Sequence, residues 1–477
     1  MEYDVVIGLE VHSELKTKSK VFCSCKNEFG GEPNTHCCPV CIGLPGALPV
    51  PNKEAVKMAI KAGLAVGCRI NDIAIFDRKN YFYPDLAKAY QISQDFRPIC
   101  LGGGVEIEKE NGEKKFIRLN RIHLEEDAGK LVHNSKAGGS MVDYNRGGVP
   151  LIEIVSEPDM SSAEEAVAYL MKLRNILQYI EVSDCKMEQG SLRCDVNISL
   201  KPKGSSVYGV RAEMKNLNSF RSVARAIEYE IKRQSRLLDE GEKVEQETRR
   251  WDDARNRSFS MRKKENAQDY RYFPDPDLLP FRIDRSLVEE VQNSMPKLRD
   301  EKIADYVNNF GLSEYDAKVL TNDLNLVKYF DKVISHFNKP KFVCNFILTT
   351  LLKKVKEDEG EDLVIPISAE NFANLMRMYE SGVISQAVCR ELFEEIWQND
   401  ADCESLVKER GLAQNNDEGE IKSMVEALIQ EFPQSVQDYK AGNAKALSFF
   451  IGQLMKRTQG KANAQIASKL IKEILDN

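Results

Sequence analysis

The chain has 477 residues, and its 67 Lys and Arg against 74 Asp and Glu give a formal net charge of −7. That length suggests about three domains, and a composition of 42% hydrophobic and 30% charged residues excludes a disordered or collagen-like chain. The mild acidity argues against a protein that coats nucleic acid without specificity, although a local basic surface could still bind RNA.

The sequence contains no candidate membrane segment. Its most apolar stretch, Phe342 to Leu352, includes Asn345 and falls short of the roughly 20 residues that span a bilayer, so we expect a core helix there. The first residues also lack the basic and apolar regions of a secretion signal. These features predict a cytoplasmic protein with no membrane contact.

The first expected strand runs from Tyr3 to His12. Because side chains alternate between the two faces of a strand, the apolar residues share one face and Glu10 and His12 lie together on the other.

A cysteine cluster follows this strand. A CxC pair and a CxxC pair are separated by twelve residues and consist of Cys23, Cys25, Cys38 and Cys41. Zinc takes four soft ligands in a tetrahedral arrangement, which two such turns can supply. A redox CxxC is the alternative, but it would not need the second pair; His36 and Cys37 stay open as further ligands. Four thiolates leave no position for a substrate, so we expect a structural zinc.

Segment 77–85 combines two cations, Arg78 and Lys79, with three aromatic residues that include Tyr81 and Tyr83. This mixture is typical of phosphate binding and base stacking. An edge strand with a buried aromatic face explains it equally well.

Carboxylates recur further along the chain. One group lies in His123-Leu-Glu-Glu-Asp127, and Glu153 stands among the apolar residues of segment 150–155. An isolated carboxylate in such a setting is costly unless it is paired or binds a cation. Oxygen ligands with one histidine suit Mg²⁺, which usually binds together with a phosphate.

Two helices are expected in the middle of the chain. Ser162-Ala-Glu-Glu165 has the spacing of a capping box and opens a helix over about 162–180. A second helix should run from about Ser219 to Leu238, with Gly241 as its C-terminal stop.

Two strands flank these helices. Strand 192–200 places Arg193 and Asp195 on one face, and strand 210–215 places Arg211, Glu213 and Lys215 together. A solvated outer face of an antiparallel sheet fits these stripes about as well as a site does. The sequence has no P-loop, GxGxxG, HExxH or GxSxG motif. Their absence argues against a P-loop or Rossmann nucleotide site, a zinc protease and a serine hydrolase.

The proline-rich stretch Phe273 to Pro280 and the polar stretch Gln398 to Glu420 suggest boundaries that divide the chain into 1–290, 291–410 and 411–477. Beyond the first boundary the pattern is helical. Residues 440–477 carry seven cations and two anions, a net charge of +5, on two expected amphipathic helices around Gly460.

Several of these segments together resemble one family, the B subunits of glutamine-dependent aspartyl/glutamyl-tRNA amidotransferases. The motifs that carry the resemblance are Gly8-Leu-Glu-Val-His12, segments 77–85 and 90–94, His123 to Lys130, Pro150 to Asp159, Glu213 to Phe220 and Asp269 to Pro274. They occur in the same order from end to end of the chain.

The resemblance implies a reaction in which ATP phosphorylates the side-chain carboxylate of misacylated Glu-tRNA(Gln) or Asp-tRNA(Asn), and ammonia then displaces the phosphate. It implies metal or catalytic roles for Glu10, His12, Glu126 and Glu153, with Glu125 and Asp195 as weaker candidates. His12 and Glu126 are the expected Mg²⁺ ligands; Glu125 and Glu126 point to opposite faces of an extended segment, so only one of them should reach the metal, and the choice between them stays open. Arg78 and Lys79 would bind phosphate, and Tyr81 and Tyr83 would line the acceptor-end pocket.

The implied fold is α+β, a cradle-shaped mixed catalytic domain followed by a helical domain and an all-helical tail that binds tRNA. The implied partners are a glutaminase A subunit, a small C subunit and misacylated tRNA, with no DNA. Two other functions stay open: a noncatalytic zinc-containing tRNA-binding adaptor, and a Mg²⁺-dependent phosphotransferase that acts on a small molecule.

Overall fold

The computed structural model of the chain describes residues 2–134, 139–263, 270–357, 363–441, 443, 445–458 and 460–476. Contacts divide the chain into two compact units, Met1–Arg299 and Asp300–Asn477. The first unit combines a large mixed sheet with helices, and the described part of the second is helical. The expected α+β class is confirmed. In the described residues no helix is both long and apolar enough to cross a membrane.

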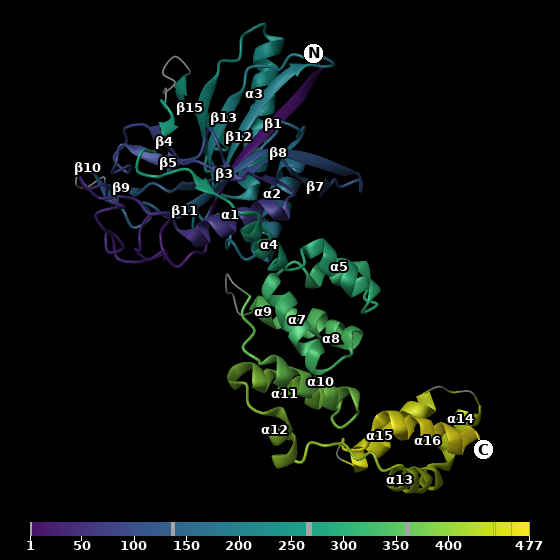
Figure 1. The fold of residues 1–477 in the computed structure, drawn as a ribbon. Helices are drawn as coiled ribbons and strands as arrows, with labels where there is room; N and C mark the ends of the chain where they lie inside the picture. The colour runs from purple at the N-terminus through teal and green to yellow at the C-terminus, as the bar shows by residue number, and fades with distance from the viewer. Residues whose placement is uncertain are drawn as a thin grey trace. The chain divides into compact units, whose positions relative to one another are not determined.

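The first unit is built around a ten-stranded sheet in the order β15-β14-β13-β12-β1-β11-β8-β6-β2, with β7 paired to β8 (Figure 1). Its strands are β1 (Tyr3–Glu14), β2 (Arg69–Ile70), β6 (Cys100–Leu101), β7 (Gly104–Glu108), β8 (Lys114–Glu126), β11 (Pro150–Ser156), β12 (Leu192–Pro202), β13 (Ala212–Leu217), β14 (Glu247–Asp252) and β15 (Arg257–Lys263). The pair β13 and β14 is parallel, and the other pairs described are antiparallel.

Helices cover the apolar face of this sheet. They are α1 (Lys53–Ala65), α2 (Ala163–Tyr179) and α3 (Phe220–Asp239), and α4 (Arg285–Asn293) packs against α1. Ile7 and Val11 of β1 are fully buried in one cluster with Leu173 of α2 and Ile227 of α3. The hydrophobic effect therefore fixes which face of β1 turns inward, and the alternate residues, which include Glu10 and His12, point to the open face.

The expected helix signals are confirmed. The Ser162 side chain accepts a hydrogen bond from the Glu165 backbone N–H at the start of α2, and Ser219 caps α3 in the same way. Gly241 follows the end of α3 with φ +75°, a left-handed conformation that favours glycine.

Smaller strands complete the first unit: β3 (Ile73–Ala74), β4 (Asp77–Asn80), β5 (Tyr90–Ser93), β9 (Lys130–Asn134), β10 (Gly139–Asp143), β16 (Phe273–Pro274) and β17 (Phe281–Arg282). β16 pairs with β4 and β17 with β3, so the proline-rich stretch between them packs on the first unit and is not a linker. The unit ends at Arg299, beyond the boundary expected near residue 290.

The second unit contains α5 (Arg299–Asn308), which begins at the division, and then α6 (Glu314–Leu320), α7 (Leu324–His336), α8 (Pro340–Phe346), α9 (Leu352–Glu357), α10 (Ala369–Glu380), α11 (Gln386–Asn399), α12 (Cys403–Glu409), α13 (Glu418–Glu431), α14 (Pro433–Lys440), α15 (Lys445–Arg457) and α16 (Ala464–Asp476). A π-helical turn, Ile347–Leu351, joins α8 to α9. The core helix expected over residues 342–352 is confirmed, with Ile347 and Leu351 fully buried.

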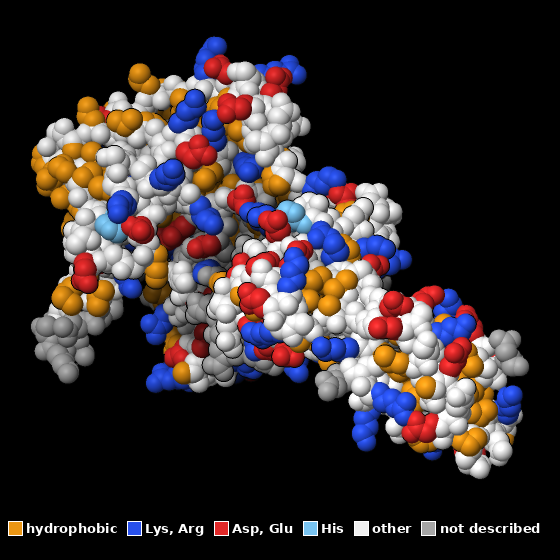
Figure 2. Space-filling model, turned by 90° about the horizontal axis from the view of Figure 1, so that it is seen from below, with side chains coloured by type: hydrophobic (Ala, Val, Ile, Leu, Met, Phe, Trp, Pro, Cys, Tyr) orange, Lys and Arg blue, Asp and Glu red, His pale blue; other side chains and the backbone are white. Residues whose placement is uncertain are grey.

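The last helices of the chain share a hydrophobic cluster between Ile421 and Leu475. The two amphipathic tail helices are confirmed as α15 and α16, which bury Phe450 and Leu470. The seven basic side chains of residues 440–477 are exposed. The domain boundary near residue 410 stays a prediction. Over the face of the molecule drawn in Figure 2, Lys and Arg side chains are interspersed with Asp and Glu.

Candidate active site and thiol cluster

The register of three neighbouring strands brings two histidines and two carboxylates together on the open face of the sheet. His12 of β1 lies opposite Glu153 of β11, and Glu153 lies opposite His123 of β8. Glu125 follows two residues after His123 and therefore shares its face. His12 Nε2 lies 3.4 Å from Glu153 Oε2 and 3.5 Å from Glu125 Oε1. His123 Nε2 lies 3.2 Å from Glu153 Oε2.

These four side chains neutralise one another. Burial lowers the pKa of His12, but the carboxylates of Glu153 and Glu125 raise it more strongly, so its net shift is upward. Burial raises the pKa of Glu153, but His123 and His12 hold it well below its usual range. One atom each from His12, Glu125 and Glu153 lies within 4.8 Å of the others, a spacing at which a cation could replace the proton on His12.

The structure places Glu125 and Glu126 on opposite faces of β8. Glu125 belongs to the histidine cluster and also accepts a hydrogen bond from Ser93 Oγ at 3.0 Å. Glu126 points to the opposite face of β8, where it pairs with Lys88 Nζ at 2.5 Å and accepts from the Ile92 N–H. Glu126 therefore does not share a cation site with His12.

A second acidic group lies beside the first. Glu10 is opposite Asp195 of β12, and Asn197 of β12 is opposite Glu213 of β13. Ligand atoms of Glu10, Asp195 and Glu213 lie within 4.8 Å of one another. Lys215 already pairs with Asp195 at 2.5 Å and with Glu213 at 2.9 Å. Burial, with help from the neighbouring carboxylates, raises the pKa of Glu10.

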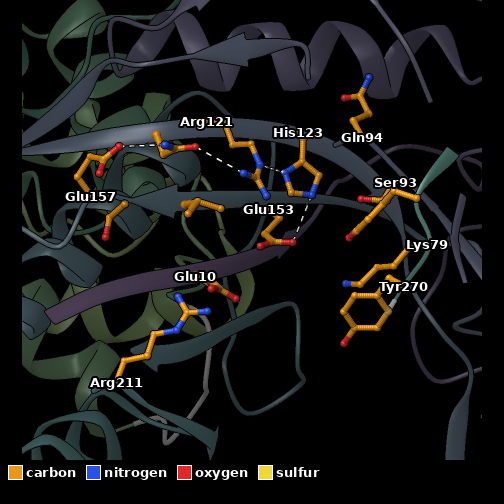
Figure 3. A pocket seen from close by; sticks show the side chains of 14 residues that line it. Glu10, Lys79, Ser93, Gln94, Arg121, His123, Glu153, Glu157, Arg211 and Tyr270 are labelled. Carbon is orange, nitrogen blue, oxygen red and sulfur yellow. Dashed lines mark hydrogen bonds and ion pairs between the residues drawn. The ribbon is translucent and has the colours of Figure 1, made fainter. Parts of the chain in front are cut away.

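Both groups border one pocket with a volume of about 380 Å³. Its lining includes Glu10, His123 and Glu153 on the sheet and Lys79, Arg121, Arg211, Tyr270 and Tyr272 around it. Figure 3 shows Lys79 and Tyr270 across the pocket from Glu10 and Arg211. A second pocket of about 500 Å³ shares Glu10 and Arg211 with the first and continues along β12 past Asn197. The site can therefore hold an elongated polar ligand.

The two cations of segment 77–85 have different positions. Arg78 is held by Asp275 at 2.8 Å and Asp277 at 2.8 Å, and it stacks on Tyr90, so it is already paired. Lys79 lies in the pocket with its ammonium 5.1 Å from the centre of the Tyr270 ring. Among the described residues, no carboxylate lies within 4.0 Å of Lys79 Nζ. The geometry favours Lys79 over Arg78 as a phosphate ligand.

The two tyrosines of this segment also differ. The ring of Tyr81 packs edge-on against Tyr270, with centroids 5.9 Å apart, but it lines a separate pocket with Phe82 and Phe273. Tyr83 is exposed and does not line either pocket described above. Its expected place in the acceptor-end pocket is not supported by its position.

The sequence reasoning gave no role to His123, Tyr270 or Tyr272, although all three lie in segments that carry the family resemblance. His123 was detectable, because a polar residue between Ile122 and Leu124 must point to the open face of the strand. Tyr270 and Tyr272 join the site from far along the chain, and no local pattern marks them. Asp269, which begins their motif, lies outside the described residues.

The four cysteines expected to bind zinc come together. The sulfur atoms of Cys23, Cys25, Cys38 and Cys41 lie within 4.8 Å of one another. Cys41 accepts a hydrogen bond from the Cys38 N–H at 3.1 Å. The pKa of Cys41 is lowered by a hydrogen bond from Cys23, by the hydrogen bond from the Cys38 N–H and by the charge of nearby Lys20. His36 and Cys37 are not part of this group.

Comparison with known proteins agrees with this arrangement. Residues 5–289 match the family described as the GatB/GatE catalytic domain, and residues 328–475 match the GatB domain family. The chain belongs to the GatB family. It is 52% identical over 473 residues to the B subunit of the aspartyl/glutamyl-tRNA(Asn/Gln) amidotransferase of Lachnoclostridium phytofermentans, with 99% of each chain covered. It is 53% identical over 479 residues to the protein of the same name from Caldicellulosiruptor bescii, with 100% of each chain covered.

Proposed function

We propose that this chain phosphorylates the side-chain carboxylate of Glu-tRNA(Gln) or Asp-tRNA(Asn) with ATP and amidates it with ammonia delivered by a partner subunit. The observation that carries the proposal is the pocket that Lys79 lines together with His123 and Glu153. Glu153 belongs to the cluster with His12 and Glu125. A cationic group and a cation-binding group on opposite sides of one cavity can stabilise the negative charge of a phosphoryl group while it is transferred.

The chemistry explains why both kinds of group are needed. A carboxylate oxygen attacks the terminal phosphorus of ATP, and ADP leaves with the electrons of the broken P–O bond. Ammonia then attacks the acyl carbon, phosphate departs with the former carboxylate oxygen, and the nitrogen loses a proton. The Lys79 ammonium and the Arg211 guanidinium can hold the phosphate oxygens in place and offset their charge.

We assign a divalent cation, Mg²⁺, to His12, Glu125 and Glu153. The donor set of two carboxylates and one imidazole fits a divalent ion, and it is preferred to the Glu10 group because Lys215 already neutralises two of those carboxylates. When bound, the ion supplies charge stabilisation for phosphoryl transfer. His123 and Ser93 orient the carboxylate ligands through the hydrogen bonds described above.

We also propose that the four-cysteine cluster holds a structural Zn²⁺, because its donors are four sulfur atoms at mutual contact distance. The names of the relatives support partner subunits for this chain. We propose a glutaminase A subunit and a small C subunit, with misacylated tRNA as substrate and the cytoplasm as location. The exposed cations of α15 and α16 would bind the tRNA backbone.

The test is ATP hydrolysis by the purified complex, measured with misacylated, correctly acylated and uncharged tRNA. The proposal expects stimulation by the misacylated form alone and transfer of labelled phosphate to the aminoacyl group when no ammonia donor is present. A tRNA-binding adaptor would show binding without turnover in this chain, and a small-molecule phosphotransferase would turn over without tRNA. Either result overturns the proposal.

A further inference from the structure

The side chain of Lys20 is fully buried next to the cysteine cluster. Its ammonium donates to Cys41 Sγ at 3.6 Å and to the backbone carbonyl of Tyr144 at 3.2 Å. No carboxylate of the described residues lies within 4.0 Å of the Lys20 nitrogen. Lysine is almost never fully buried unless it is paired with an anion, so this position requires an explanation.

The cluster carries its largest negative charge when it holds a metal. Four protonated thiols are neutral and would leave the ammonium without a counter-charge in a dry environment. Four thiolates around a divalent metal carry a net double negative charge, and Cys41, which contacts Lys20, is the most buried of the four cysteines. A buried cation at this sulfur therefore matches the metal-bound cluster, with its net double negative charge, better than the metal-free one.

We propose that Lys20 is the buried counter-ion of the metal–thiolate cluster and a positioning residue that ties the cluster to the catalytic sheet. The proposal rests on the zinc site proposed above. Lys20 contacts Tyr144, and the neighbouring Val21 N–H donates to the Gly148 carbonyl at 2.9 Å. These residues lead directly into β11, the strand that carries Glu153.

The proposal predicts unequal effects of one substitution in the two metal states. Lys20→Met keeps most of the side-chain volume and removes the charge. In the zinc-loaded full chain it should speed zinc transfer to a chromogenic chelator by about 10- to 100-fold, the usual range for residues that contact metal ligands. It should also lower the Tm of the zinc-loaded chain more than the Tm of the zinc-stripped chain, because the cluster carries its larger negative charge only when the metal is bound.

Lys18→Met is the matched control, since Lys18 lies in the same loop with an exposed side chain. It should change the zinc-transfer rate less than twofold. If Lys20→Met lowers both Tm values equally, or transfers zinc at the wild-type rate, Lys20 is only a packing residue and the proposal is wrong. If the wild-type chain holds less than half an equivalent of zinc, the zinc site itself is wrong and both proposals fall.

A second variant covers the case in which Lys20→Met does not fold. Cys41→Asp places a carboxylate beside Lys20, so the metal-free Cys41→Asp chain should have a higher Tm than the metal-free Cys23→Asp chain. Cys23→Asp is the control, because its side chain is half-buried in the same cluster but makes no contact with Lys20 among the interactions described. Equal Tm values for the two aspartate variants would overturn the proposal.

Discussion

The adjacent residues Glu125 and Glu126 offer a matched pair of substitutions, because they point to opposite faces of β8. Glu125→Gln removes a negative charge from the His12 and Glu153 cluster and keeps nearly the same volume. Loss of a charged ligand should weaken the divalent ion at least about 10- to 100-fold. We expect carboxylate phosphorylation to fall by about 100-fold or more, equivalent to roughly 2.7 kcal/mol of transition-state stabilisation.

Glu126→Gln should behave differently. It breaks the ion pair with Lys88, whose side chain is 13% exposed, but an amide oxygen can still accept from the Ile92 N–H. Weakening this charged hydrogen bond should cost about 2 kcal/mol of folding free energy and lower the Tm by a few degrees. Phosphorylation measured below that temperature should stay within a few-fold of the wild-type rate.

The assay is transfer of labelled phosphate from ATP to misacylated tRNA by the purified complex, titrated with Mg²⁺. Glutamine hydrolysis by the partner provides an internal control and should persist in both variants. If Glu126→Gln abolishes phosphorylation at an unchanged Tm while Glu125→Gln retains it, the assignment of the two faces is wrong.

Three further predictions follow from the same geometry. Lys79→Met should raise the KM for ATP about tenfold or more with little change in Tm, since Met preserves the contact with Tyr270; an unchanged KM would exclude Lys79 as a phosphate ligand. Burial and the nearby Asp127 raise the pKa of Glu14 to about 7, so its ionisation opposes folding as pH rises from about 4.5 to 7. Glu14→Gln should therefore raise the Tm more at pH 8 than at pH 5, and an equal gain at both would contradict that shift. Removal of residues after 410 should weaken tRNA binding and reduce its salt dependence, because eight exposed Lys and Arg side chains are lost; filter binding at several salt concentrations measures both, and tight binding by the truncated complex would make the tail a structural appendage.

The elements that could be predicted from the sequence are those specified by short-range patterns. The alternation in β1, the capping box of α2 and the apolar spacing of α15 each depend on residues within one or two turns or a single strand. The cysteine cluster was predictable for a related reason, since its two pairs have the spacing of metal-binding turns. Local physical chemistry is sufficient at these positions.

Long-range partners could not be predicted in this way. Arg78 and Lys79 are both cations next to aromatic residues, and nothing in segment 77–85 tells them apart. Arg78 is neutralised by Asp275 and Asp277, which follow almost two hundred residues later, and Lys79 instead faces the pocket. Tyr270 reaches the same pocket because its segment folds back along β4. The role of a cation depends on the partners that tertiary structure provides.

The positions of Glu125 and Glu126 depend on tertiary partners, but the sequence did contain the signal that decides which face each one occupies. Ile122 and Leu124 are fully buried, so they point to the covered face of β8, and Glu126 continues their two-residue period. His123 and Glu125 occupy the alternate positions on the open face, which is also the face of His12 and Glu153. Extending the apolar alternation of residues 122–124 by two positions assigns Glu126 to the covered face, and therefore Glu125 to the open face, without any knowledge of the sheet order. The two carboxylates are indistinguishable when compared with each other, and only the apolar residues that precede them tell them apart.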